Sequence, residues 1–396
     1  MWIEFSEFNL KILILLIFPV SKRVQDYTKK AYLVKDHQLF KTFRYFSSYV
    51  FAFIPLLIMK YRTKNIEEPN QEVKKESEEV PPRSGSFSTN EITELKKRHL
   101  RKRKIKSLIF LGILCVNGLF CYFYRYLFEQ PQFAIAKQSI GIFFEIFDYV
   151  GLSYFILKQK LYKHNFVFAG IIALVVFILF LISIPDMESG YIFTSFVYYF
   201  FFSMLFGIYD VLGKLYMVKF FISPYLFMFL IGSINSILLL IYDFFAYFIN
   251  PDVSGIIIGF QNNILSVGDV FLFILDLMVQ CIWNLGIWLT VYYFTPCHYF
   301  ISEYISEYVY YMITAVEKNE GFYSTVNIVI FSISYFINFL CGLFFNEVLI
   351  LNLFGLDYNT KKRIEERLQK EYEETDKANK MLEMEVPKEE DDDENN

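Results

Sequence analysis

Charged residues are scarce in this chain, because only 20% of its 396 residues are Asp, Glu, Lys or Arg. Glycine and proline are also infrequent, with 17 and 11 residues, which excludes a collagen-like or Gly/Pro-rich protein. Apolar residues instead make up 55% of the chain and aromatic residues 20%, and the mean hydropathy is +0.35. This balance excludes an ordinary water-soluble domain. It predicts an all-α integral membrane protein, in which each crossing takes about 20 mostly apolar residues.

Residue types that carry common enzyme and metal chemistry are few. The five cysteines lie in or beside apolar segments without a CxxC spacing, which argues against a disulfide framework or a zinc site. The four histidines do not cluster, and there is no GxSxG, HExxH or glycine-rich phosphate loop. We therefore expect no enzyme activity, no cofactor and no metal. One alternative stays open, a membrane acyl- or phosphoryl-transfer enzyme that uses His298 with a carboxylate.

Ten apolar segments are candidates for membrane-spanning helices. They cover residues 5–20, 39–59, 107–127, 135–157, 166–184, 191–216, 224–249, 270–294, 299–315 and 326–351. The first has the shortest unbroken apolar core, so it either spans the membrane or lies in the interface. Pattern and length thus predict ten transmembrane helices.

One long polar insertion, residues 61–106, separates the second and third segments. Its first half is rich in Glu, Pro and Ser and is typical of a disordered linker, whereas residues 96–104 read KKRHLRKRK. Ser88 and Glu91 have the spacing of a capping box, so we expect the third helix to begin there and to extend through the basic run. Basic residues beside a span favour a cytosolic location and contact with anionic lipid, not nucleic acid.

Charge in the remaining loops predicts the topology. Loops 186–190 and 251–269 contain no Lys or Arg, whereas the alternate loops are basic, so both termini are predicted to be cytosolic. If the first segment spans the membrane, Lys22 and the neighbouring basic residues lie on the noncytosolic side, which disagrees with this topology. The expected order is helices one and two in residues 1–60, the cytosolic insertion in 61–106, helices three to five in 107–184, helices six to ten in 185–351 and a cytosolic charged tail in 352–396. Either an endomembrane or the plasma membrane fits.

A short internal similarity suggests two related halves. Residues 145–150 (EIFDYV) and 303–309 (EYISEYV) each lead, through a short link, into one more long apolar helix. Together with the sequence YYFTP at 292–296, this pattern resembles the drug/metabolite transporter superfamily, in its EamA-like and nucleotide-sugar-transporter-like branches. The resemblance implies ten transmembrane helices as two inverted five-helix repeats. Residues 206–214 and 346–362 also resemble multi-pass proteins of single-celled eukaryotes.

Ionisable residues inside apolar helices are the best candidates for function, because each costs about 2.5–3.5 kcal/mol to insert at the centre of a membrane. Such groups usually face a protein interior or an aqueous cavity. The candidates for binding a solute are Lys137, Glu145, Asp148, His298, Glu303 and Glu307. The first three share one face of the fourth helix, and the last two share one face of the ninth.

These residues predict a transporter that moves a small polar metabolite between the fourth and ninth helices. Glu303 and Glu307 repel each other when both are ionised, so one of them is expected to hold a proton or to face a cationic group. Proton coupling or a cationic solute therefore fits the residues. The family resemblance also implies nucleotide sugars as candidate substrates. The alternative is a receptor or structural multi-pass protein. Asp276, with Gln280 and Asn284, fits hydrogen bonding between helices as well as it fits a cavity.

Overall fold

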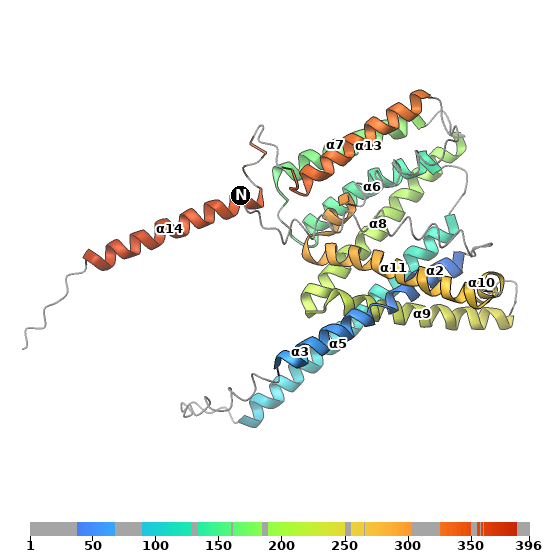
Figure 1. Cartoon of the computed structure of the whole chain (residues 1–396), viewed down its shortest axis with the longest axis horizontal. Coiled ribbons are helices and arrows are strands. Elements are labelled where there is room, and N and C mark those ends of the chain that lie inside the picture. The colour runs from blue at the N-terminus through green and yellow to red at the C-terminus, as the bar shows by residue number, and fades with distance from the viewer. Residues whose placement is uncertain are drawn as a thin grey trace, which may run out of the picture.

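The computed structural model of the chain describes residues 38–67, 89–128, 134–159, 161–183, 189–249, 255–264, 266–302, 325–349, 355–356, 358 and 360–385, and it is all-helical over these ranges (Figure 1). The predicted first segment at 5–20, residues 68–88 of the insertion and the ninth helix beyond residue 302 lie outside them.

The described helices follow in chain order. They are α2 (Gln38–Val50), α3 (Phe53–Glu67), α5 (Thr89–Phe128), α6 (Ala134–Phe155), α7 (Lys163–Ser183), α8 (Ser189–Phe220), α9 (Pro224–Ile249), α10 (Gly255–Asn263), α11 (Val267–Tyr293), α13 (Thr325–Phe345) and α14 (Lys361–Glu385). Residues 296–302 are also helical and form the start of the predicted ninth helix.

Six of these helical segments are long and apolar enough to cross a membrane. They are Leu39–Met59, Leu100–Tyr124, Lys163–Ile182, Ile192–Phe220, Pro224–Ile249 and Val267–Tyr293. The prediction of a helical multi-pass membrane protein is confirmed at this level. Two further predicted spans are helical but are not among these six. α6 carries three charged residues, and the most apolar part of α13, Ser332–Phe345, is shorter.

The second predicted span is one apolar segment divided into two helices. α2 ends at Val50, a turn follows at residues 51–52, and α3 begins at Phe53. Pro55 accounts for the break, because it has no N–H to donate to the carbonyl of Phe51 and its ring crowds that carbonyl. The division leaves the buried residues of α2 on a separate short helix.

The helices pack in two connected groups. α2 lies against α9 and α11, whereas α6 lies between α7 and α8, and α13 packs along α7 (Figure 1). α5 contacts both α8 and α9 and so joins the groups. The largest apolar core surrounds Phe46, Trp288 and Met217, and a second one lies between α6, α7 and the residues that follow α11. α8 contacts α6, α5 and α11 and so lies next to both groups.

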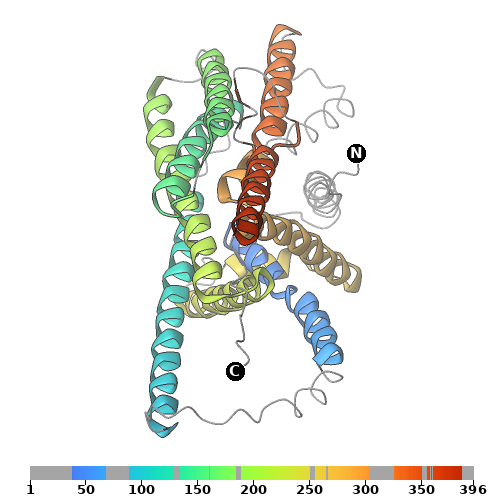
Figure 2. The same cartoon turned by 90° about the vertical axis from the view of Figure 1, so that its left-hand side faces the viewer.

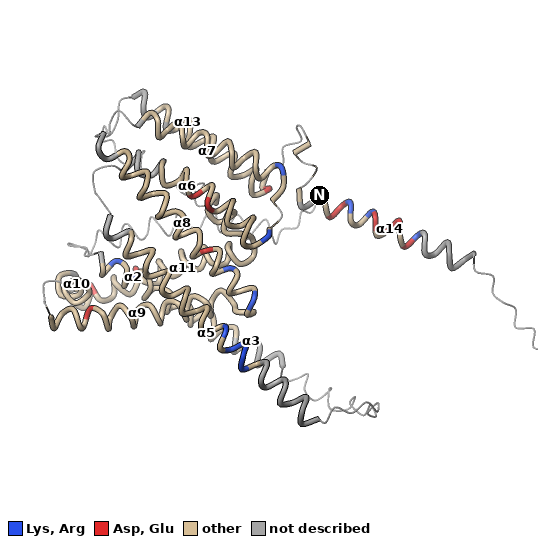
Figure 3. The backbone as a smooth tube through the Cα atoms, turned by 180° about the vertical axis from the view of Figure 1, so that it is seen from behind, with Lys and Arg blue, Asp and Glu red and all other residues tan. Residues whose placement is uncertain are grey.

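α5 is much longer than a membrane is thick. Its 40 residues extend about 60 Å at 1.5 Å per residue, about twice the hydrocarbon thickness. The helix protrudes from the bundle in Figure 2, and Figure 3 shows Lys and Arg on the protruding part. Arg101, Lys102, Arg103 and Lys104 are all exposed. The prediction that the third helix continues through the basic run is confirmed.

α14 lies within the predicted charged tail, and it extends away from the bundle (Figure 1). Its described side chains are nearly all exposed, with an ion pair between Arg363 and Glu366 at 3.0 Å. Arg367 lies over the ring of Tyr358 at 4.0 Å from the centroid. α14 is therefore a solvated helix. Exposed pairs of this kind contribute little to its stability.

α10, a helix of nine residues, lies within the segment 251–269 that the sequence predicts to be a loop. Asp243, near the end of α9, accepts hydrogen bonds from the amides of Ile256 at 3.0 Å and Ile257 at 2.9 Å. A carboxylate there satisfies amides of the first turn that have no helical partner. Phe40 of α2 packs so closely on Gly259 that a Cβ on that glycine would lie 2.5 Å from the ring. α10 thus covers the ends of α2 and α9.

Removing the carboxylate of Asp243 should loosen this cover. We expect Asp243→Ala to lower the free energy of unfolding by about 1–2 kcal/mol, the usual cost of deleting a capping side chain. The measurement is denaturant unfolding of the purified protein in detergent micelles. Asp243→Asn, which keeps one acceptor oxygen, should lose less than the alanine variant. Equal stability of wild type and Asp243→Ala would show that the two hydrogen bonds do not hold α10 in place.

Candidate functional site

Of the six predicted site residues, the structure describes the side chains of Glu145, Asp148 and His298. The backbone of Lys137 lies in α6, but its side chain is not among the described ones. Glu303 and Glu307 fall outside the described residues, so their prediction is untested.

The acidic residues of α6 face α8. Glu145 and Asp148 are half-buried, and Ser203 of α8 donates a hydrogen bond to Asp148 at 2.5 Å. The next residue, Tyr149, is buried and donates to the Oδ2 atom of Asp210, also at 2.5 Å. Gly207 lets the two helices approach here, because a Cβ on it would lie 2.9 Å from Leu152. Two carboxylates, one from each helix, are therefore held at the α6–α8 contact.

The ninth helix begins beside this contact. Thr295 accepts a hydrogen bond from the amide of His298 at 3.0 Å, and Pro296 occupies the first helical position, where its missing N–H costs nothing. Phe300 then stacks on Tyr149 with ring centroids 5.0 Å apart and an angle of 15° between the planes. α6 and the start of the ninth helix are thus in direct contact.

The side chain of His298 contacts the residue that begins its own helix. Its Nδ1 atom lies 2.7 Å from the hydroxyl of Thr295, and its ring packs against Phe345 of α13 with centroids 5.1 Å apart. Ser302 donates to the carbonyl of His298 at 2.7 Å. The Thr-Pro-x-His sequence therefore reads as a helix-starting motif, with the imidazole between the capping threonine and α13.

Lys214 is a functional candidate that stands one turn after Asp210 on α8. The buried ammonium group donates a hydrogen bond to the carbonyl of Phe294, the residue that ends α11. The negative end of the helix dipole of α11 stabilises a cation at this position. Through Asp210 and Lys214, α8 bears one acidic and one basic group, which reach two different neighbouring elements.

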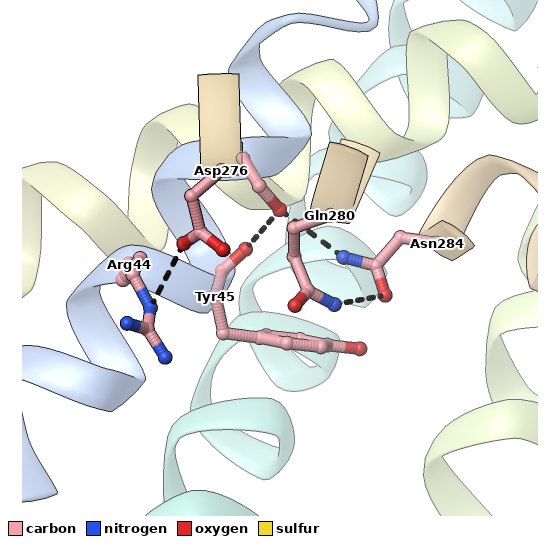
Figure 4. A network of polar contacts seen from close by, with 6 residues as sticks. Arg44, Tyr45, Asp276, Gln280 and Asn284 are labelled. Carbon is pink, nitrogen blue, oxygen red and sulfur yellow. Dashed lines mark hydrogen bonds and ion pairs between the residues drawn. The ribbon is translucent and has the colours of Figure 1, made fainter. Parts of the chain in front are cut away.

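A second polar region lies between α2 and α11 (Figure 4). The Nε atom of Arg44 lies 3.4 Å from Oδ2 of Asp276, and both side chains are buried, with 7% and 0% of their surface exposed. Arg44 was not singled out from the sequence, because it stands near the start of a span, where arginine often faces the membrane interface. Its partner is distant in sequence, so only the fold brings the two together. The pair is a buried intramembrane charge pair.

Amide and hydroxyl groups continue this region along α11 at intervals of four residues. Asn284 donates to Ser48 of α2 at 3.1 Å and accepts from Gln280 at 3.5 Å (Figure 4). One turn further, the indole of Trp288 donates to the hydroxyl of Tyr49 at 3.1 Å. The sequence interpretation of Asp276 and Asn284 as groups that join helices agrees with these contacts. The sequence alone shows this four-residue spacing, and residues four apart share one helical face.

Comparisons with known proteins leave the family open, since no family model and no curated protein matches this chain. Within the described ranges, no group of three His, Cys, Asp or Glu side chains is placed to hold a metal ion. What the site offers chemically is a set of hydrogen-bonding and charged groups inside apolar helices. Those groups suit recognition of a polar molecule.

Proposed function

We propose that this chain is a transporter that moves a small polar metabolite across a membrane, along a path between α6 and the helix that begins at residue 296. The observation that carries the proposal is the buried junction at which Tyr149 joins α6, α8 and the ninth helix. It donates to Asp210 and stacks on Phe300. Ionisable groups inside membrane helices are costly and usually mark a solute or ion path.

Helix pairing supports the proposed architecture of two inverted five-helix repeats. If helix n of the first half corresponds to helix n+5 of the second, then α2 corresponds to α9, α5 to α11, and α7 to α13. The contacts of α2 with α9 and of α7 with α13 would then lie on the axis that relates the halves. The same operation exchanges the contact of α2 with α11 for that of α9 with α5, and both contacts are present. Such pairing is expected of a transporter built from repeats.

Proton coupling is part of the proposal. Glu303 and Glu307 follow Phe300 on the ninth helix in the sequence, so they would continue the path past Tyr149. The basic part of α5, residues 96–104, would contact anionic lipid headgroups at the cytosolic surface, with both termini on the same side. The alternative is a receptor or structural membrane protein, which requires no aqueous path through these helices.

Water access to the junction distinguishes the two functions. Ser203 is fully buried beside Asp148. In a background without the five native cysteines, we expect Ser203→Cys to react with a small water-soluble thiol reagent, because a transport cycle opens the path to water. Ala169→Cys, buried in the apolar core that α7 shares with α6 and α13, is the matched control and should stay unreactive. If both variants stay unreactive in folded protein in liposomes, the bundle is dry and the scaffold alternative holds.

A further inference from the structure

Several buried polar atoms have no hydrogen-bond partner where α5, α8 and α9 meet. Asn235 of α9 has no exposed surface, yet neither Oδ1 nor Nδ2 of its amide is paired within the described part of the chain. The hydroxyl of Tyr209 on α8, a residue only 3% exposed, and Nδ2 of Asn117 on α5 are unpaired in the same sense. Three helices thus contribute unsatisfied polar groups.

Tyr209 and Asn235 both lie next to Gly118 of α5. A Cβ placed on Gly118 would lie 3.0 Å from the ring of Tyr209 and 3.5 Å from Nδ2 of Asn235. Asn117 is the neighbouring residue on the same helix. Trp288 of α11 meets the ring of Tyr209 edge to face, with centroids 5.6 Å apart, so aromatic surface adjoins the polar groups.

Packing alone does not account for this cluster. A buried amide or hydroxyl without a partner is costly, and more so in a membrane, where no surrounding water can satisfy it. An apolar side chain at any of these positions would avoid the cost. Groups left unsatisfied by the protein are the ones available to bind another molecule.

The charged groups nearby are already engaged. Asp210, which follows Tyr209 on α8, accepts from Tyr149, and Asp243 holds the amides of α10. Arg44 keeps one unpaired nitrogen, Nη1, but its charge is balanced by Asp276. The hydrogen-bonding capacity that remains at the cluster is therefore uncharged, with amide donors, an amide acceptor and a phenol.

We propose that Asn235, Tyr209 and Asn117 form a binding subsite for an uncharged polar solute. A side-chain amide presents a donor and an acceptor next to each other, which suits a solute with an acceptor and a donor on adjacent atoms, such as an amide or a diol. The subsite lies on the face of α8 next to that of Asp210, so it adjoins the proposed path. This inference rests on the proposed function and names the substrate class that the path carries.

The buried position of the subsite also defines when it can be filled. Tyr209 and Asn235 are covered by α2, α5 and α11 in this conformation. A solute reaches them only after these helices move apart, as alternating access requires. The acidic residues of the ninth helix would then carry a proton while the amide subsite holds a neutral solute.

The test is uptake into liposomes that contain the full-length protein. The probe is a water-soluble cell extract freed of macromolecules, and mass spectrometry identifies the compounds that accumulate and their charge at neutral pH. We expect uncharged polar compounds to accumulate, and Asn235→Leu to reduce their uptake at least about tenfold, corresponding to a loss of about one hydrogen-bonded contact in the membrane interior. Tyr209→Phe removes only the hydroxyl and should reduce the same uptake while the ring packing remains.

Ser236→Ala is the matched control, because Ser236 follows Asn235 but its hydroxyl lies 3.3 Å from Ser47 of α2. It should take up the same compounds as wild type. Accumulation of charged compounds only, or equal uptake by wild type, Asn235→Leu and Tyr209→Phe, would overturn the subsite while leaving transport established. If wild type accumulates nothing beyond protein-free liposomes, the proposed function fails together with the inference.

Discussion

Replacing Arg44 by leucine should lower the free energy of unfolding by about 3–5 kcal/mol, the largest stability effect that we expect from one substitution. Arg44 and Asp276 are both buried, and the guanidinium Nε lies 3.4 Å from the carboxylate. Without the guanidinium, the carboxylate loses the charge that balances it in a medium of low dielectric constant. Denaturant unfolding in detergent micelles measures the loss, which should be largely independent of salt because the pair is shielded from solvent.

The double variant Arg44→Leu/Asp276→Leu tests the cause of that loss. It removes both charges, so it should recover a large part of the stability that the single variant loses. A double variant as unstable as the sum of the two single variants would show that each side chain acts through its own packing. In that case the ion pair would contribute nothing of its own to the contact between α2 and α11.

Gly232→Ala should disrupt the contact between α2 and α9. A Cβ at this position would lie 2.4 Å from Cβ of Tyr49 and 2.7 Å from the carbonyl oxygen of Phe46, which belongs to the backbone of α2. A backbone atom cannot move aside without shifting its helix, so we expect a loss of about 1–3 kcal/mol from overpacking. Thermal unfolding of the purified protein measures it, and Gly232→Leu should be worse.

Gly170→Ala on α7 is the matched control, because a Cβ there meets no atom within 4 Å. The alanine should raise stability by about 0.5–1 kcal/mol, since it reduces the freedom of the unfolded chain without a clash. Opposite signs for the two substitutions would identify the close approach of α2 and α9 as the cause. If Gly232→Ala is as stable as Gly170→Ala, then the helices are not this close in the protein.

The membrane helices could be predicted from the sequence because their signal is local. Residues 39–59 and 224–249 were predicted as spans, and Leu39–Met59 and Pro224–Ile249 are candidate spans with these same bounds. Length and apolar composition decide such segments without tertiary information. The break at residues 51–52 could have been read from Pro55, whereas α10 is too short to stand out from a loop by hydropathy.

The polar contacts could be predicted only in part. Asp148 and Asp276 drew attention because a carboxylate in an apolar helix needs a partner. Their partners, Ser203 and Arg44, are common residue types at distant positions, so no local pattern identifies them. The contact of Lys214 could not be predicted for a different reason. Its acceptor is the backbone carbonyl of Phe294, which any residue at that position would provide.

α8 connects the junction with α6 and the proposed amide subsite in the proposed mechanism. Asp210 on one face reaches α6 through Tyr149, and Tyr209 on the next face lies near Asn235 and Trp288. A movement of α8 relative to α6 would therefore change the surroundings of the carboxylate and of the amide subsite together. This geometry would couple an acidic group to a neutral binding site through one rigid helix.

Uptake by the purified protein in liposomes, compared with its Asp210→Asn variant, tests the central claim most directly. The asparagine keeps the size of the side chain and an acceptor for Tyr149 but removes the charge and the proton affinity. The account predicts that at least one polar solute accumulates with wild type above protein-free liposomes, and that correctly folded Asp210→Asn loses most of this uptake. Failure of wild type to accumulate any solute, or full uptake by the variant, would contradict a transport path at the junction of α6, α8 and the ninth helix.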